Sequence, residues 1–234
     1  VPTAICTVPR EATGAEDPGE RPATGAVAVG TNQRNNLYLY RANGSDPPEL
    51  IREFRGHSGQ IHSLSVSSDG NYLASGSSDS TVSIWNLQDL FTATPLVNRW
   101  GADFVIEGGN LIATGVREDG PLYFRGVRGG DRLVLLEWVD YDAKSFAESD
   151  PVKMQQRLGD LPFDLMLQLK FERLGRPGPN FQSYAAWQPL VTLYVDEERE
   201  WACWTPAGYY DASFNGHQRF GWQINRSIDQ PVDY

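Results

Sequence analysis

Apolar residues alternate with polar ones in a stretch that begins at Glu53 and ends at Trp85. A period of two residues is typical of half-buried β-strands. The alternation predicts three short strands, Ile61–Val66, Tyr72–Ser77 and Val82–Trp85. The residues between them, Ser68-Asp69-Gly70 and Ser78-Asp79-Ser80, favour tight turns. The stretch therefore predicts three consecutive strands joined by short turns.

Weaker copies of this pattern occur on both sides. On the N-terminal side the expected strands are Ala26–Thr31 and Leu37–Arg41, followed by the segment Glu49–Phe54. On the C-terminal side they are Leu111–Gly115, Leu122–Phe124 and an outer strand, Arg132–Val139. Tyr40 and Phe124 stand where the central copy has Trp85. The copies follow one another at intervals of roughly 40 to 45 residues, so we expect three related units.

The central copy resembles a WD40 repeat, which forms one four-stranded blade of a β-propeller. The resemblance rests on the Gly56-His57 pair, the spacing of the turns and the closing Trp85; Asn86 stands where Asp is usual. It implies a hydrogen-bonded chain made of His57, Ser75 or Ser77, Asp79 and Trp85. The same residue types also occur in catalytic triads, but their repeat spacing favours a structural network.

The repeat pattern is lost between residues 140 and 189. Ser149-Asp150-Pro151 is typical of a helix start, and Gly159 of its end. Phe163–Phe171 alternates like a strand, yet it consists of helix-forming residues, and we interpret it as helix. Gly175–Asn180 is expected to be a loop. This partly helical insertion either binds a partner or caps an exposed sheet edge.

Strands are expected again at Leu190–Val195 and Glu200–Trp204. The segment that follows, Trp204 to Asn225, resembles one near the end of many bacterial WD40-repeat proteins, which are often joined to a caspase-like peptidase domain. Aromatic residues dominate it. Together with Trp201 just before the segment, they either pack a closing blade or form a platform for a sugar or peptide; the residues are Trp201, Trp204, Tyr209, Tyr210 and Trp222.

Charge and cysteine content narrow the function classes. The net charge is -10 over 234 residues, which argues against duplex DNA or an anionic membrane as partner. Cys6 and Cys203 are too few for a disulfide scaffold, and reduced thiols are expected. Residues 1–25 are polar and rich in Pro and Gly, which predicts a flexible tail or linker. No apolar run is long enough to span a membrane, and the cytoplasm is the expected compartment.

Catalytic and metal chemistry find little support. A caspase-like site needs a Cys and a His on a parallel α/β sheet; Cys203 with His217 or His57 lies in no such pattern. His57, His62 and His217 do not have the spacing of metal ligands. No glycine-rich loop precedes a helix. We therefore expect no catalytic residue, no metal and no cofactor, and a peptidase domain, where it exists, would lie outside these residues.

Together these patterns predict an all-β protein, a WD40-type β-propeller with a partly helical insertion. A closed propeller has four or more blades, so the chain is expected to be the C-terminal part of a longer propeller. The expected division is residues 1–25 tail, 26–139 three blades, 140–189 insertion and 190–234 a closing β segment.

The predicted function is a non-catalytic scaffold or sensor for protein partners. The partner is either a caspase-like protease, linked or separate, or the remaining blades of the propeller. The alternatives are a non-catalytic fragment of a WD40–peptidase protein and a carbohydrate- or peptide-binding β domain. Loops at blade tops usually hold partners, which by position alone points to Arg55, Ser58 and Gln60.

Overall fold

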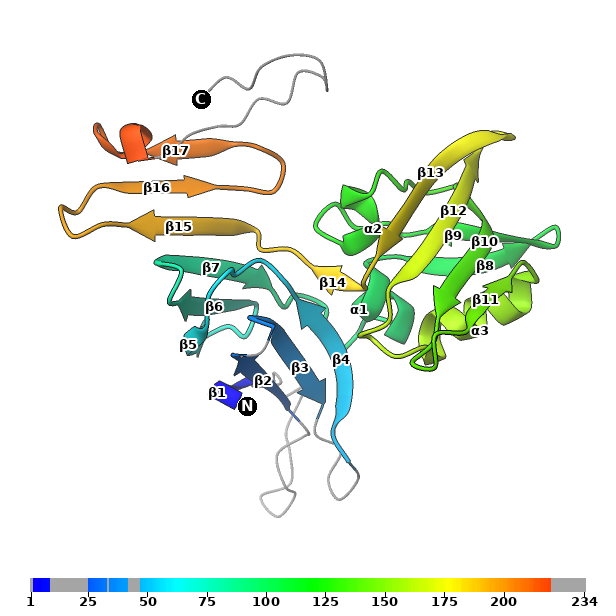
Figure 1. Cartoon of the computed structure of the whole chain (residues 1–234), viewed down its shortest axis with the longest axis horizontal. Coiled ribbons are helices and arrows are strands. Elements are labelled where there is room, and N and C mark those ends of the chain that lie inside the picture. The colour runs from blue at the N-terminus through cyan, green and yellow to red at the C-terminus, as the bar shows by residue number, and fades with distance from the viewer. Residues whose placement is uncertain (1, 9–24, 33, 42–46, 220–234) are drawn as a thin grey trace.

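A computed structural model describes residues 2–8, 25–32, 34–41 and 47–219, and three sheets dominate it (Figure 1). The first sheet has the order β1-β2-β3-β4-β14. Its first four strands form an antiparallel meander, and β14 adds in parallel to β4. The bounds are β1 Pro2–Val8, β2 Ala26–Thr31, β3 Leu37–Arg41, β4 Glu49–Phe54 and β14 Ala186–Trp187.

The second sheet combines two distant parts of the chain, in the order β17-β16-β15-β7-β6-β5. β15 pairs antiparallel with β7, although more than 100 residues separate the paired Ser83 and Thr192 in sequence. The strands are β5 Ile61–Val66, β6 Tyr72–Ser77, β7 Thr81–Asn86, β15 Val191–Val195, β16 Trp201–Trp204 and β17 Tyr210–Ala212, followed by the 3₁₀ helix η1 Gly216–Arg219.

The third sheet lies between these two parts in sequence, in the order β13-β12-β10-β9-β8, with β11 also paired to β10. Three helices accompany it: α1 Pro95–Trp100, α2 Pro121–Phe124 and α3 Pro151–Asp160. The strands are β8 Asp103–Glu107, β9 Asn110–Thr114, β10 Arg132–Val139, β11 Ser145–Glu148, β12 Leu167–Arg173 and β13 Arg176–Ser183.

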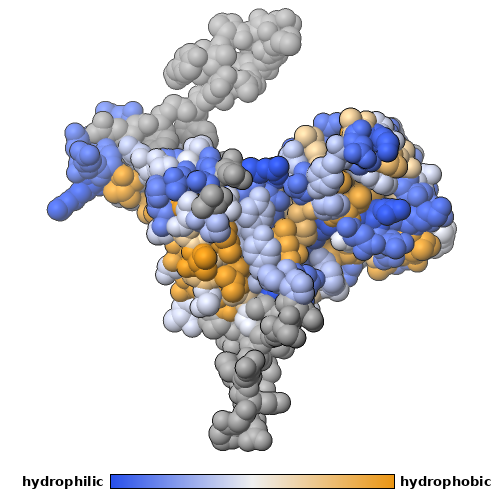
Figure 2. Space-filling model, turned by 60° about the horizontal axis from the view of Figure 1, so that its bottom comes forward, coloured by the Kyte–Doolittle hydropathy of each residue, from blue (hydrophilic) through white to orange (hydrophobic). Residues whose placement is uncertain are grey.

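Two hydrophobic cores divide the molecule into two lobes. The first two sheets stack through β1, β2 and β5 and share one core, which includes Leu39, Ile61, Leu73 and Trp85. The third sheet encloses its own core with α1 and α3. Figure 2 shows the two lobes side by side, with a patch of apolar surface on the left-hand one, formed by the first two sheets, and further apolar areas on the right-hand one. The third sheet reaches that lobe through α1, which packs on β4 and β14.

Most of the predicted strands are present. β2, β3, β5 and β6 have the predicted bounds. β15 and β16 differ by one residue at one end, and β7 and β9 differ by one residue at each end. The helix start at Asp150 is also confirmed, because its side chain accepts a hydrogen bond from the Lys153 N–H and so caps α3. The protein is therefore all-β with a partly helical segment, as predicted.

Three local predictions are wrong. Phe163–Phe171 is not a helix: from Leu167 onward it is β12, whose alternating residues bury Leu169 and Phe171 on one face. Alternation decided the structure here, because tertiary packing outweighs weak helix propensity. Gly175–Asn180 lies mostly in β13 and not in a loop, and Leu122–Phe124 belongs to α2, which begins with Pro121 at its first position.

Two further expectations need correction. Pro2–Val8 is not a tail: it is β1, in which Cys6 pairs with Ala28, while the part of the predicted tail at residues 9–24 lies outside the described residues. Arg132–Val139 is a strand, but not an outer one, because β9 flanks it on one side and β12 on the other. β12 and β13 also extend this sheet into the segment interpreted as an insertion.

Candidate partner-binding cleft

The four residues of the expected polar chain lie together between the first two sheets. His57 Nδ1 lies 3.0 Å from Asp79 Oδ2, and His57 Nε2 lies 2.7 Å from Ser75 Oγ. Trp85 Nε1 donates to the same Ser75 Oγ at 2.8 Å. The serine in the chain is thus Ser75, since the Ser77 hydroxyl instead accepts from the Asp79 N–H. A carboxylate only accepts, so a neutral His57 carries its proton on Nδ1.

Asp79 anchors this chain to the neighbouring turn. Its two oxygens accept from the Ser58 N–H at 2.8 Å and from the Thr81 hydroxyl at 2.6 Å. Partial burial raises the pKa of Asp79, but the bonds from Thr81 and Ser58 and the charge of His57 outweigh it and lower the pKa to about 2. Thr81 was not among the expected members, although its position two residues after Asp79 is typical of an Asx turn.

A nucleophilic role does not fit this geometry. Ser75 is 1% exposed, and its hydroxyl is held between His57 and Trp85 inside the core. Gly56 tightens the same region: a Cβ there would lie 3.0 Å from Trp85 Cη2 and from Pro189 Cδ. These hydrogen-bonded side chains therefore fix the segment that follows β4 against β7. They also position the neighbouring surface.

That surface is a cleft of about 430 Å³ between the lobes. Its floor is the end of β4, at Arg55 and Gly56. One wall comes from the second sheet, at Thr192, Trp204 and Pro206. The opposite wall comes from α2 of the third sheet and from the chain around β14; it includes Pro121, Arg125, Ser183, Tyr184, Ala186, Gln188 and Pro189.

Arg55 is held rigidly on the floor. Its Nε donates to Glu53 Oε1 at 2.7 Å, and its guanidinium carbon lies 3.8 Å from the centre of the Tyr184 ring. Glu53 is 1% exposed and also accepts from Asn36 Nδ2 at 2.7 Å. Burial raises the pKa of Glu53, against the lowering by Arg55. Arg55 thus neutralises a buried carboxylate while its Nη1 and Nη2 make no hydrogen bond within the described residues.

The predicted contact residues are only partly brought together. Arg55 lines the cleft, whereas Ser58 and Gln60 do not. Ser58 is exposed and its carbonyl oxygen accepts from Asn35 Nδ2 at 2.9 Å, and the carbonyl of Gln60 accepts from the Ser78 N–H. These hydrogen bonds leave Ser58 and Gln60 able to contact a partner at the surface. Of the three predicted contact residues, however, Arg55 alone lines the cleft.

The aromatic residues near the C-terminus do not form a single platform. Trp204 pairs with Thr192 and Tyr210 in neighbouring strands, which places it on the face that lines the cleft. Trp201 lies three residues earlier in β16 and so projects from the opposite face. Tyr209 lies in the turn before β17 and is 77% exposed. Trp222 lies outside the described residues.

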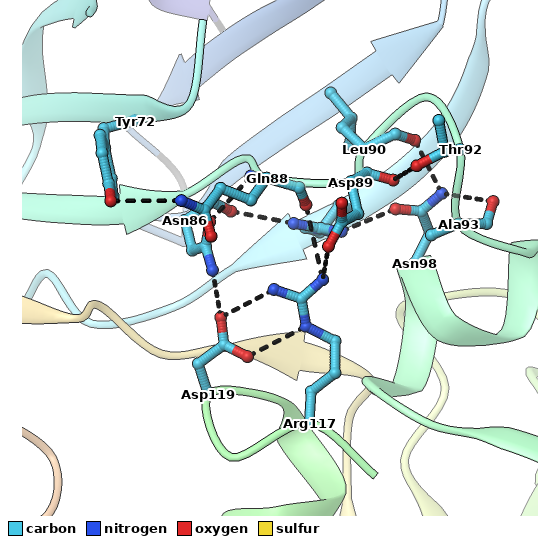
Figure 3. A network of polar contacts seen from close by, with 11 residues as sticks. Tyr72, Asn86, Gln88, Asp89, Leu90, Thr92, Ala93, Asn98, Arg117 and Asp119 are labelled. Atoms are coloured by element: carbon cyan, nitrogen blue, oxygen red, sulfur yellow. Dashed lines mark hydrogen bonds and ion pairs between the residues drawn. The ribbon is translucent and has the colours of Figure 1, made fainter. Parts of the chain in front are cut away.

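A buried arginine, Arg52, joins the two lobes at a junction of polar contacts, and Figure 3 shows two of its partners there, Asn86 and Asn98. Arg52 of β4 is fully buried; it donates to the Asn86 carbonyl at 2.9 Å and to Asn98 Oδ1 at 2.6 Å. Its guanidinium carbon lies 4.0 Å from the centre of the Trp187 ring, and Trp187 Nε1 donates to the Asn98 carbonyl at 2.7 Å. Burial, and then the like charge of Arg117, lower the pKa of Arg52 to about 9.

The residue that replaces the usual Asp belongs to the same junction. Asn86 Nδ2 donates to Asp119 Oδ2 at 2.5 Å, and Figure 3 shows Arg117 directed at Asp119 and Asp89. Burial raises the pKa of Asp119, but the hydrogen bonds from Arg117 and Asn86 outweigh it and lower the pKa. Sequence reasoning missed this junction, because only the fold brings β4, α1 and the loop after β9 together.

Other chemistry finds no site in the described part of the chain. His, Cys, Asp and Glu side chains form no group suited to a metal ion there. Cys6 and Cys203 are both unpaired thiols, and burial raises the pKa of Cys6. Over the same residues, no helix combines the length and apolar character that crossing a membrane requires.

Comparison with known proteins identifies one sequence motif in this chain. Residues 48–86 match the family model "WD domain, G-beta repeat". A stretch of 42 residues is 50% identical to a ribosome biogenesis protein BOP1 homolog from Oryza sativa subsp. japonica; it covers 18% of this chain and 6% of that protein. The chain therefore contains a WD40 repeat, formed by β4 to β7.

Proposed function

We propose that this chain is a non-catalytic scaffold or sensor that binds a protein partner in the cleft above its WD40 repeat. WD40 repeats commonly mediate protein interactions. The observation that carries the proposal is the cleft itself: it has a volume of about 430 Å³, it lies between the lobes, and its floor residue Arg55 is fixed by Glu53 and Tyr184. Preformed concave surfaces with rigid anchors are favoured binding sites, because little ordering is left to oppose binding.

The partner we propose is a caspase-like protease, either linked to this chain or separate, in the cytoplasm. The resemblance of the segment Trp204 to Asn225 to bacterial WD40 proteins supports it, and the unpaired thiols of Cys6 and Cys203 are in keeping with a reducing compartment.

Further blades are the second proposed partner, and the outer face of the second sheet supports them. Val82 and Leu193 pair across β7 and β15 on the face opposite to the buried Ser83 and Thr192. Val82 is 40% exposed and Leu193 is partly exposed, so this face is apolar and incompletely covered. A further sheet stacked there would bury it, much as β5 packs against β1 and β2 and buries Ile61.

Site-specific photo-crosslinking tests the proposal. p-Benzoylphenylalanine is placed at Gln188, which is exposed and lines the cleft, and at Lys153, which is exposed on α3. In the cell that produces the protein, Gln188 is expected to capture a defined protein that Lys153 does not. Mass spectrometry then shows whether the captured protein has a Cys–His peptidase domain or WD40 repeats. Equal patterns at both positions would contradict a partner in the cleft.

A further inference from the structure

We propose that the cleft recognises an acidic peptide segment, with a Glu or Asp carboxylate bound by Arg125 and Arg55. This inference rests on the proposed scaffold role and names the chemistry of its partner. Among the described residues, the charged ones that line the cleft are these two arginines, in a chain whose net charge is -10. A cationic cleft attracts anionic side chains, while the acidic remainder of the surface repels acidic proteins that do not fit the cleft. The combination makes binding more selective.

The two arginines have different roles. The charge of Arg55 is balanced by Glu53, and its guanidinium is fixed between that carboxylate and the Tyr184 ring. Arg125 is exposed and forms no side-chain ion pair within the described residues. Arg125 therefore supplies the uncompensated positive charge, whereas the free Nη groups of Arg55 supply oriented donors. A carboxylate with two oxygens suits such planar donors.

The remaining walls favour a peptide over a small free anion. Trp204 and Tyr184 offer aromatic surface, and Pro121, Pro189 and Pro206 offer rigid apolar surface. A lone anion would leave these walls in contact with water. An acidic residue flanked by apolar residues would satisfy both the charge and the apolar area, and a volume of about 430 Å³ accommodates a few side chains. The overall negative charge argues against a nucleic acid.

The test uses three heptapeptide libraries with fixed central Glu, Gln or Lys and flanks randomised among apolar residues and Gly. The full chain is immobilised, and the retained fraction of each library is measured. We expect the Glu library to be retained about tenfold more than the Gln library, since charge-assisted hydrogen bonds are the strong ones. Higher salt should reduce this preference, because the site is open to solvent.

Two charge-matched variants locate the effect. Arg125→Gln should lose the preference for Glu, whereas Lys153→Gln on α3 should keep it. Arg55→Lys retains the charge beside Glu53 but not the planar donors, and should weaken the preference in part while the thermal unfolding curve keeps its shape. Equal retention of the Glu and Gln libraries by the unmodified chain would overturn the inference, as would equal behaviour of the two Gln variants.

The crosslinking and library experiments together distinguish a failure of this inference from a failure of the proposed function. Capture of a partner at Gln188 together with equal retention of all libraries would reject the acidic peptide and leave the scaffold. Failure of both experiments would reject the scaffold as well.

Discussion

At the scale of single residues, the polar chain of the WD40 repeat shows how spacing encodes contacts. Its members are as many as 28 residues apart in sequence. The hydrogen-bonded atoms nevertheless lie within 3.0 Å of each other, in the order Asp79, His57, Ser75 and Trp85. The resemblance left Ser75 and Ser77 open, and the strand period cannot decide between them, because residues two apart lie on the same face of β6. The distances decide: the Ser75 hydroxyl lies 2.7 Å from His57 Nε2, whereas the Ser77 hydroxyl bonds the Asp79 N–H. We propose that the chain serves stability, and its charge makes that role measurable.

Asp79→Asn should destabilise the protein by about 1 to 2 kcal/mol at neutral pH, after allowance for partial solvent screening. The folded pKa of Asp79 is about 2, below its ordinary 3.8. The stabilisation is therefore present above pH 3.8 and is lost as the pH falls through 2. Urea unfolding of both proteins should show a gap that narrows between pH 4 and pH 2. Asp142→Asn, an exposed carboxyl in a turn, is the control. A gap independent of pH would contradict the assignment.

Asn98 is the residue that joins most parts of the junction. It accepts from Arg52, its Nδ2 donates to the Leu90 carbonyl at 3.0 Å, and its carbonyl accepts from Trp187. Asn98→Ala would leave a fully buried guanidinium with one partner fewer, which should cost about 2 to 4 kcal/mol.

Thermal unfolding measures the cost, and hydrogen exchange should show α1 opening more often than α3. Asn110→Ala, whose side chain bonds Arg132 at the surface of the third sheet, should cost much less. Similar losses of stability in Asn98→Ala and Asn110→Ala would contradict a stabilising role of the junction.

At the scale of elements, the sequence predicted strands best where alternation and turn residues agree. β5 and β6 have both signals. The start of α3 is marked twice as well, by the capping Asp150 and by Pro151 at its first position. β12 has alternation but helix-forming residues, and β13 contains Pro and Gly; a sheet edge tolerates these, because β13 pairs on one side with β12. Local propensity misled the interpretation of β12 and β13, where pairing with β10 and with each other supplied the stabilisation.

Gly101 gives a prediction at this scale, because it ends α1 with φ of 67° and donates to the Val97 carbonyl at 2.8 Å. A Cβ there would lie 2.5 Å from Gly120 Cα, just before α2. Gly101→Ala should therefore cost about 2 to 4 kcal/mol, from backbone strain plus the displaced α2. Gly109 is the matched control: its φ is 75° and nothing lies within 4 Å of a Cβ. Gly109→Ala should cost only about 1 kcal/mol. Equal unfolding midpoints of the two variants in urea would show that the close approach of α1 to α2 does not contribute to stability.

At the scale of the whole molecule, the outcome departs furthest from the sequence pattern. The third sheet does not stack on the second; it joins the other lobe through α1, β14 and the Arg52 junction. β15 then returns to complete the second sheet. Neither event has a local signal, because the partners are distant in sequence: Arg52 and Asn98 are 46 residues apart, and Ser83 and Thr192 are 109 residues apart. The cleft arises from this arrangement, which is why the sequence indicated Arg55 but not Arg125 or Tyr184.

The cleft between the lobes is proposed to hold an acidic segment of a protein partner. The most direct measurement is the yield of the crosslinked partner from Gln188 in the unmodified protein, in Arg125→Gln and in Lys153→Gln, at equal protein levels. We predict that Arg125→Gln lowers the yield about tenfold and that Lys153→Gln leaves it unchanged. A yield that is the same in all three proteins would contradict the account.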